Sequence, residues 1–274
     1  MKEKETNKNY PVDLNEDNNI FYGLKLDDNQ RKFRDAIWDE KNIVTICNAK
    51  AGTGKTTIAV ATANLLCEYN RYKGIVYVVS PSMEEKQGYL PGDQTAKSAP
   101  YMEPLCEALI SIGLDPQKVI IDQNNPQALK NGTAYVEFMT HTFLRGTNFE
   151  NKVIIIDESQ NYYFDELKKV LTRIHDNCKI IIIGHTEQCD LYKNSKMSGF
   201  KYYLDAFNNI KDDERVAVCN LTKNYRGWFS TFCDNVPIPV TGTDVQTVNN
   251  LTGKKYSKPY FLPVNLKSST SAVD

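Results

Sequence analysis

Four residues at the start of a predicted helix, Gly52, Gly54, Lys55 and Thr56, have the types and the spacing that bind a phosphate group. The two glycines let the backbone turn tightly, so that successive N–H groups can point toward an anion. The lysine ammonium would reach the terminal phosphates, and the threonine hydroxyl would bind Mg²⁺. The stretch therefore predicts a P-loop that holds a nucleoside triphosphate.

Elements on either side of this loop support the prediction of a phosphate site. Residues 43–47 form an apolar run that predicts a short buried strand, and residues 58–66 predict a helix. Ala49 stands where the G-x-x-x-x-G-K-T pattern has its first glycine, and its methyl group fits if its φ is negative. A chance glycine turn before a helix is the alternative, which the strand and the helix together disfavour. The predicted nucleotide-binding residues of the loop are Ala51, Gly52, Thr53, Gly54, Lys55, Thr56 and Thr57.

An acidic pair, Asp157 and Glu158, directly follows the apolar run of residues 153–156. In a P-loop protein, an aspartate at this place holds Mg²⁺, directly or through water, and the next glutamate polarises the attacking water as general base. Such a pair could instead cap a helix, but the P-loop upstream favours the interpretation of a Walker B pair. Thr56 and Asp157 are then the predicted metal residues. Lys55 and Glu158 are the first predicted catalytic residues.

Three further polar residues could take part in catalysis. Gln188 lies shortly after the apolar run of residues 179–183 and would contact the γ-phosphate or the attacking water, with a polar turn as the alternative. Arg226 or Arg145 could offset negative charge in the transition state as an arginine finger, within the chain or across a subunit boundary. A surface salt bridge is the alternative for either arginine. These three residues complete the predicted catalytic set.

Apolar strands that alternate with helices predict an α/β fold. The strongest apolar runs carry no alternating polarity, as expected for parallel strands that are covered on both faces. Strands are predicted over residues 43–47, 74–80, 135–139, 153–156, 179–183 and 215–219. Helices are predicted near residues 26–38, 58–66, 101–112, 164–174 and 199–207, and after residue 226. We expect a single P-loop domain with a mostly parallel central sheet flanked by helices, and a ligand beyond the carboxyl ends of its strands.

The composition changes along the chain in a way that predicts its domain organisation. Residues 1–20 are polar and charged, and they predict a flexible lead-in. Residues 21–239 form the predicted P-loop domain, within which the Gly- and Pro-bearing residues 81–100 predict a long loop. Residues 240–274 are rich in Thr, Asn, Lys and Ser and predict a tail or arm, in which residues 256–264 could form an edge strand.

The overall composition of the 274 residues indicates a soluble protein. A formal net charge of -1 gives no sign of a strongly basic nucleic-acid binder. Seven scattered cysteines without a C-x-x-C pair argue for free thiols in a reducing compartment, and three histidines lack metal-ligand spacing. No apolar signal segment or membrane-spanning run is apparent. We expect a cytoplasmic protein that binds no membrane, in the host cytoplasm if the chain is phage-encoded.

Several short motifs lie between residues 26 and 204, and two of them, those that begin at Gly88 and at Asp157, are more specific than any P-loop. They are Ala51-Gly52-Thr53-Gly54-Lys55-Thr56, Gly88-Tyr89-Leu90-Pro91-Gly92-Asp93, Leu144-Arg145-Gly146, Asp157-Glu158-Ser159-Gln160-Asn161, Leu171-Thr172-Arg173 and Gly184 with Gln188. With these motifs the chain resembles the PhoH-like proteins, phosphate-starvation-inducible P-loop ATPases related to the motor core of superfamily-one helicases. The resemblance implies a RecA-like domain with ATP and Mg²⁺ as its ligands. It also implies that Gln30 reads the adenine base.

Four positions depart from the pattern of that family. PhoH-like proteins usually have Gly where Ala49 stands, Arg-Pro where Ser80-Pro81 stands, a further Arg where Thr147 stands and Asp where His185 stands. The lost acidic and arginine groups bear on phosphate sensing, whereas the main phosphate and metal residues are retained. The segment ending in Arg226 is closer to the Asn-Tyr-Arg motif of superfamily-one helicases, in which that arginine touches the γ-phosphate.

The resemblance implies ATP hydrolysis coupled to the binding or remodelling of RNA or single-stranded DNA. A complete helicase of this type needs two motor domains, so a homo-oligomer, for example a ring, would have to supply the second. The first alternative is a nucleotide-gated binding or regulatory module with little turnover. A third interpretation is a small-molecule kinase. The sequence shows no arginine-rich lid of the kind that such a kinase uses, and the acidic pair favours water over a substrate hydroxyl as the acceptor of the phosphoryl group.

Overall fold

The chain forms two compact units, Met1–Lys223 and Asn224–Asp274. The computed structural model describes residue 14 and residues 21–80, 94–122, 128, 130–141, 148–186 and 198–234, with the backbone alone for residues 94–99. The predicted domain boundary at residue 239 and the predicted edge strand over residues 256–264 lie outside the described residues, so both stay predictions.

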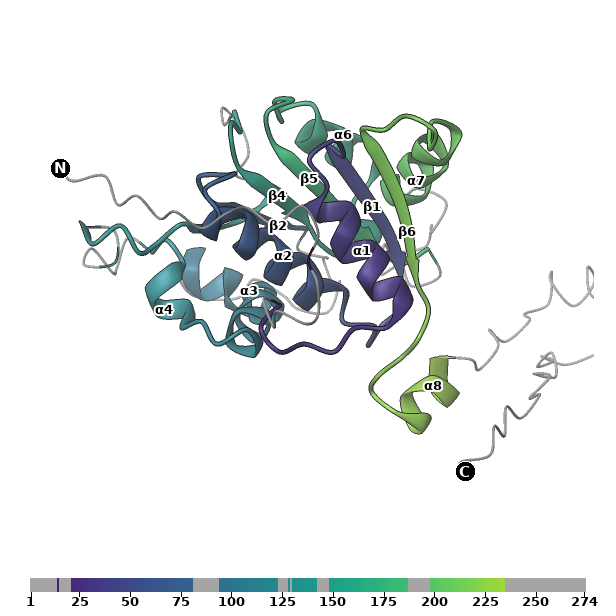
Figure 1. Ribbon diagram of the computed structural model, residues 1–274, viewed down its shortest axis with the longest axis horizontal. Helices are drawn as coiled ribbons and strands as arrows, with labels where there is room; N and C mark the ends of the chain where they lie inside the picture. The colour runs from purple at the N-terminus through teal and green to yellow at the C-terminus, as the bar shows by residue number, and fades with distance from the viewer. Residues whose placement is uncertain are drawn as a thin grey trace, which may run out of the picture. The chain divides into compact units, whose positions relative to one another are not determined.

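Parallel strands form the central sheet of the first unit (Figure 1). They are β1 (Val44–Ala49), β2 (Ile75–Val79), β3 (Val136–Thr140), β4 (Val153–Ile156), β5 (Lys179–Gly184) and β6 (Val216–Leu221). Their order across the sheet is β3-β2-β4-β5-β1-β6, and every pairing is parallel. All residues of β2 and β4 are buried, which explains why these strands read as unbroken apolar runs. The predicted α/β fold with a parallel sheet is confirmed.

Helices cover both faces of this sheet. Those of the first unit are α1 (Asp28–Trp38), α2 (Lys55–Glu68), α3 (Gln94–Ser111), α4 (Pro116–Val119), α6 (Phe164–Leu171) and α7 (Gly199–Asn209). Tyr77 and Ile155 belong to the apolar layer shared with α1, α2 and α3, whereas Val76 and Ile154 belong to the layer shared with α6 and α7. Successive side chains of a strand point to opposite faces, so one short apolar run supplies both layers.

The extent of α3 corrects one prediction. The composition of residues 81–100 predicts a loop, whereas α3 begins at Gln94 and contains Pro100 and Pro104. A proline inside a helix removes one hydrogen bond and crowds the preceding turn. Leu105 and Leu109 of the same helix are fully buried in the layer shared with α2. Burial of these side chains stabilises the helix in spite of its two prolines.

Two short elements were not predicted from the sequence. They are α4 and the 3-10 turn η3 (Ser159–Asn161), each about one turn long and too short for periodicity to reveal. The second unit contributes α8 (Trp228–Asp234), which confirms the helix expected after Arg226. Within the described ranges, no helix combines the length and the apolar character that crossing a bilayer requires.

Candidate nucleotide site

The loop between β1 and α2 has a backbone suited to cradle a phosphate. Gly52 and Gly54 have φ values of 70° and 76°, a region in which a side chain is strained. Gly54 caps α2, so that the helix begins at Lys55 and its first N–H groups face the loop. The Thr53 hydroxyl donates to the carbonyl oxygen of Lys50 at 2.9 Å and braces the loop from within.

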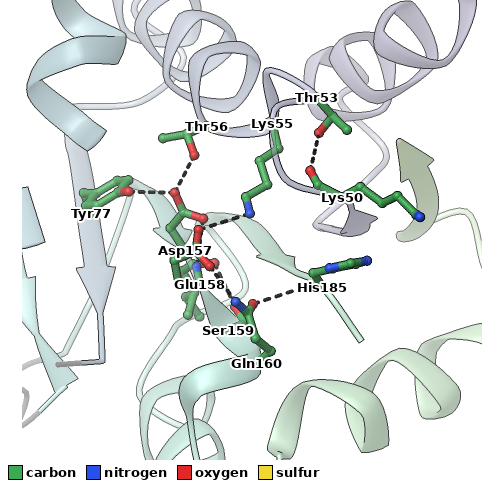
Figure 2. A network of polar contacts seen from close by, with 11 residues as sticks. Lys50, Thr53, Lys55, Thr56, Tyr77, Asp157, Glu158, Ser159, Gln160 and His185 are labelled. Atoms are coloured by element: carbon green, nitrogen blue, oxygen red, sulfur yellow. Dashed lines mark hydrogen bonds and ion pairs between the residues drawn. The ribbon is translucent and has the colours of Figure 1, made fainter. Parts of the chain in front are cut away.

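The ammonium group of Lys55 lies 3.1 Å from Oε1 of Glu158 (Figure 2). Burial lowers the pKa of this lysine, but the carboxylates of Asp157 and Glu158 outweigh burial and raise it above its usual value. The ammonium is therefore charged in the folded protein. It stands at the carboxyl edge of the sheet, where the terminal phosphates of a bound nucleotide would meet it.

Asp157, which directly follows β4, is fully buried and accepts three hydrogen bonds (Figure 2). The hydroxyls of Thr56 and Tyr77 each donate to Oδ2 at 2.6 Å. The backbone N–H of Glu158 donates to Oδ1 at 2.8 Å. The carboxylate is thus held by groups from α2, β2 and its own chain neighbour, which fixes its orientation before any ligand binds.

The two neighbouring carboxyl groups differ in acidity. Burial and the charge of Glu158 raise the pKa of Asp157, against the opposing effect of Lys55 and of the two hydroxyl donors. Burial also tends to raise the pKa of Glu158, but Lys55 and Gln160 outweigh it and hold that pKa below its usual value. The side chain of Glu158 is 43% exposed. An ionised and accessible carboxylate can accept a proton from water, so the geometry suits Glu158 to the role of base.

Glu158 also has an unusual backbone. Its φ of 48° and ψ of 41° lie in the left-handed region, which costs a residue with a side chain about 1–3 kcal/mol. Beyond it, the buried Gln160 donates from Nε2 to Oε2 of Glu158 at 2.5 Å. The carbonyl oxygen of the same amide accepts the backbone N–H of His185 at 3.0 Å. Gln160 therefore ties the candidate base to the segment that follows β5.

Gln30, the predicted adenine reader, lies in the first turn of α1 and is buried. Its Nε2 donates to the carbonyl oxygen of Thr53 at 2.9 Å, and its Oε1 accepts the backbone N–H of Asp27 at 2.9 Å. The first bond joins α1 to the phosphate loop, and the second closes the capping box of the helix. A primary amide can make further hydrogen bonds, so a role toward a base stays a prediction.

The structure brings together only part of the predicted set. Thr57 lies in the first turn of α2, and Ala51 lies in the turn before it. Gln188 and Arg145 lie outside the described residues. Arg226 belongs to the second unit, where its backbone N–H donates to Oδ1 of the nearby Asn224 at 2.8 Å. The catalytic roles of these last three residues stay predictions.

Three of the departures from the family pattern have a described environment. Ala49 is the last residue of β1 and does not have a positive φ, so its methyl group causes no backbone strain. Ser80 follows β2 and His185 follows β5, and both are buried at the carboxyl edge. The fourth departure, Thr147, lies outside the described residues.

Sequence analysis missed the part played by Tyr77 and the link made by Gln160. A signal for Tyr77 was present, because it is the only residue of the apolar strand β2 with a polar side chain. A hydroxyl buried in such a strand needs a partner. Gln160 was recognised only as part of a motif, and its partner His185 is 25 positions away in sequence.

The chemistry of the donor set fits a magnesium nucleotide. Mg²⁺ is commonly bound by one or two carboxylates or hydroxyls together with phosphate oxygens of the substrate. Thr56 and Asp157 supply a hydroxyl and a carboxylate beside the ammonium of Lys55. Among the described residues, no group of three or more His, Cys, Asp or Glu side chains could hold a metal ion without such a substrate.

Comparison with known proteins identifies the family of the chain and several of its relatives. A sequence model described as PhoH-like protein matches residues 25–225. A PhoH-like protein of Synechocystis is 35% identical over 196 residues, which cover 71% of this chain and 55% of that protein. Protein PhoH of Escherichia coli K12 is 32% identical over 187 residues, which cover 67% of this chain and 49% of that protein.

The chain spans about half the length of these curated relatives. Among solved structures, the Sulfolobus solfataricus SWI2/SNF2 ATPase core in complex with dsDNA aligns with a TM-score of 0.39 and 16% identity. That alignment covers 72% of this chain and 45% of the other.

Proposed function

Because the chain belongs to the PhoH-like protein family, we propose that it binds ATP with Mg²⁺ at the carboxyl edge of its sheet and hydrolyses the nucleotide. One observation carries the proposal. A lysine and a threonine that begin α2 meet an acidic pair that follows β4, at 3.1 Å for Lys55 and Glu158 and at 2.6 Å for Thr56 and Asp157. These four groups are the ones that positioning and charge stabilisation of a phosphoryl group require.

Each residue has a defined part in this proposal. The N–H groups at the start of α2 and the ammonium of Lys55 would bind the β- and γ-phosphates. Thr56 and Asp157 would hold Mg²⁺, which when bound offsets the negative charge of the phosphates. Glu158 would orient the attacking water and accept its proton. A γ-phosphate competes with Glu158 for Lys55, so nucleotide binding would release the carboxylate for this task.

The decisive experiment is phosphate release by the purified protein and its Glu158→Gln variant. Loss of the base should lower turnover by a factor of about 10²–10⁴ and leave binding of a fluorescent ATP analogue intact. Glu150→Gln is a matched control, because Glu150 is an exposed glutamate whose partner, His175, lies outside the site. Equal and near-zero rates for wild type and Glu158→Gln would overturn hydrolysis and leave the nucleotide-gated binding module as the function.

We extend the proposal to a nucleic-acid partner, RNA or single-stranded DNA. Its support is the resemblance of the motifs to superfamily-one motor cores. The test measures the ATPase rate with and without each polymer, at several salt concentrations, on protein sized by light scattering. Stimulation by either polymer supports the coupling, and identical rates in all conditions contradict it.

An arginine finger that acts between subunits of a ring would explain how a single motor domain can work. The candidates remain Arg226 and Arg145. Mixing Arg226→Ala protein with Lys55→Ala protein tests the first of them, because each variant lacks a different part of a shared site. Restored or poisoned activity at intermediate mixing ratios supports action across a subunit boundary, and strictly additive activity contradicts it.

A further inference from the structure

Of the described donors to Asp157, Tyr77 is the one that belongs neither to α2 nor to the acidic pair. It lies in β2, and its hydroxyl donates to Oδ2 of Asp157 at 2.6 Å. The two residues are 80 positions apart in sequence. Figure 2 shows the phenol on the side of the carboxylate opposite Lys55, with Thr56 between them. The contact therefore joins a neighbouring strand to the candidate metal residue.

The position of the phenol is fixed by its surroundings. The side chain of Tyr77 is 1% exposed, and its ring is nearly parallel to that of Phe138 in β3, at 25° and 6.3 Å between centroids. The residues of β2 on either side are buried and aliphatic. A phenol keeps its proton at neutral pH and can donate it. Within the described part of the chain, this donor has the carboxylate of Asp157 as its only partner.

A count of acceptor positions shows what the contact does to Asp157. Each carboxylate oxygen has two lone-pair directions. Oδ2 uses both, one for the hydroxyl of Thr56 and one for that of Tyr77. Among the residues that the structure describes, Oδ1 accepts only the N–H of Glu158 and keeps one direction. The remaining acceptor capacity of Asp157 therefore lies on Oδ1.

We propose that Tyr77 is a positioning residue of the nucleotide site, which turns Asp157 so that its Oδ1 serves the nucleotide-bound cation. This inference rests on the proposed function, because it concerns the same site. Thr56 keeps its role beside the cation, since a hydroxyl that donates its proton to Oδ2 still has lone pairs to offer. Groups that orient a ligating side chain commonly affect metal affinity by a factor of about 10–100.

The alternative is that the phenol merely fills the layer between β2 and α2. The chain offers a matched control in Tyr162, which is also fully buried. The hydroxyl of Tyr162 has no hydrogen-bond partner among the described residues. Tyr77→Phe and Tyr162→Phe thus remove the same atom from two buried tyrosines, and only the first removal takes a donor from Asp157.

The experiment measures the dissociation constant of a fluorescent ATP analogue in Mg²⁺ and in EDTA for wild type and both variants. We expect Tyr77→Phe to weaken binding in Mg²⁺ by about tenfold, to change binding in EDTA by less than about twofold and to raise the Mg²⁺ concentration at half-saturation. Tyr162→Phe should leave all three quantities unchanged. Replacement of Tyr77 by 4-aminophenylalanine, which keeps a donor, should restore the Mg²⁺ effect, whereas 4-methylphenylalanine of similar size should not.

The outcomes separate this inference from the function on which it rests. Equal loss of affinity in Mg²⁺ and in EDTA, or equal behaviour of the amino and methyl replacements, overturns the positioning role of Tyr77 alone. A wild-type protein that binds the analogue no better with Mg²⁺ than without it overturns both the proposed magnesium site and this role. If Tyr77→Phe does not fold, the amino and methyl replacements decide the question, because both fill the original volume.

Discussion

Two buried charged side chains lie at opposite edges of the sheet, and they are held in different ways. Asp157 follows β4 at the carboxyl edge and is bound by two side-chain hydroxyls and one backbone N–H. Lys179 begins β5 at the amino edge, and its ammonium donates to the backbone carbonyl oxygens of Asp39, at 2.6 Å, and of Asn42. Both side chains are fully buried.

The difference between the two edges lies in what their partners can do besides holding the charge. The carbonyl oxygens around Lys179 belong to the short connection after α1, so this ammonium fastens that connection to the sheet. The partners of Asp157 include Thr56, a residue that itself faces the candidate phosphate site. A buried charge at the amino edge thus serves the fold, whereas one at the carboxyl edge also prepares a site.

Burial pushes both groups toward their neutral forms. It raises the pKa of Asp157, together with the charge of Glu158, and it lowers the pKa of Lys179 to about 7, together with Arg71. The two edges should therefore respond to pH with opposite signs. Ionisation of the aspartate destabilises the fold as pH rises, and protonation of the lysine destabilises it as pH falls.

The largest effect is expected from a change at the carboxyl edge. Lys55→Ala should lower ATP turnover by at least about 10²-fold, because it removes the ammonium that, in the proposed function, binds the terminal phosphates. The melting temperature should change little, since the partner carboxylate of Glu158 is partly exposed. Steady-state phosphate release and thermal denaturation check the two expectations. Lys118→Ala is the control for removal of an exposed lysine, and comparable turnover in both variants would contradict the assigned role.

A second prediction concerns the amino edge and its pH dependence. The pKa of Lys179 is about 7 in the folded protein, lower than the ordinary value of 10.5 for a lysine. Between these pH values the unfolded chain holds more protons, so stability rises with pH, by at most about 1.4 kcal/mol per unit. Lys179→Met should lack this contribution and leave turnover unchanged. Urea denaturation between pH 7 and pH 9 measures it, with Lys41→Met as an exposed control.

If Lys179→Met instead abolished turnover while its stability remained that of wild type, the distinction between the two edges would fail. If the stability of Lys179→Met showed the same pH slope as wild type, the buried ammonium would not be the source of that slope.

The smallest effect is expected from the backbone of the loop. Gly54→Ala places a methyl group at a φ of 76° and 3.3 Å from Nε2 of Gln30. It should cost about 1 kcal/mol of stability and weaken ATP binding several-fold, because it disturbs both the cap of α2 and the tie to α1. Gly113→Ala is a matched control, since its φ is 79° and nothing lies within 4 Å of the added carbon. If the two variants bound ATP with equal affinity, Gly54→Ala would act through backbone strain alone, without an effect of the added methyl group on the tie to α1.

The fold could be predicted from the sequence because each strand corresponds to a local apolar run. The apolar runs at residues 153–156 and 179–183 predict strands, and they are found as β4 and β5. The start of α3 was not predicted, because the Gly- and Pro-bearing composition of residues 81–100, with Pro100 at its end, is typical of a loop, whereas the helix begins at Gln94 and is held by its buried residues Leu105 and Leu109.

The candidate site could be predicted only in part, because some of its contacts join residues that are distant in sequence. Lys55 and Asp157 occur in motifs that sequence reveals directly. The contact of Tyr77 with Asp157 depends on the pairing of β2 with β4, whose register places Tyr77 opposite Ile155. No local pattern contains that register. Contacts made across neighbouring strands appear only once the strands are ordered in space.

The left-handed backbone of Glu158 bears on how this sequence can change under selection. Glycine adopts such a conformation without strain, so Glu158→Gly relieves the backbone while it removes the carboxylate. A library selected for heat resistance alone should therefore enrich glycine at this position, and one selected for ATP turnover should retain glutamate. The two selections should favour different residues at this one position. The left-handed backbone that presents the carboxylate of Glu158 is strained for any residue that has a side chain.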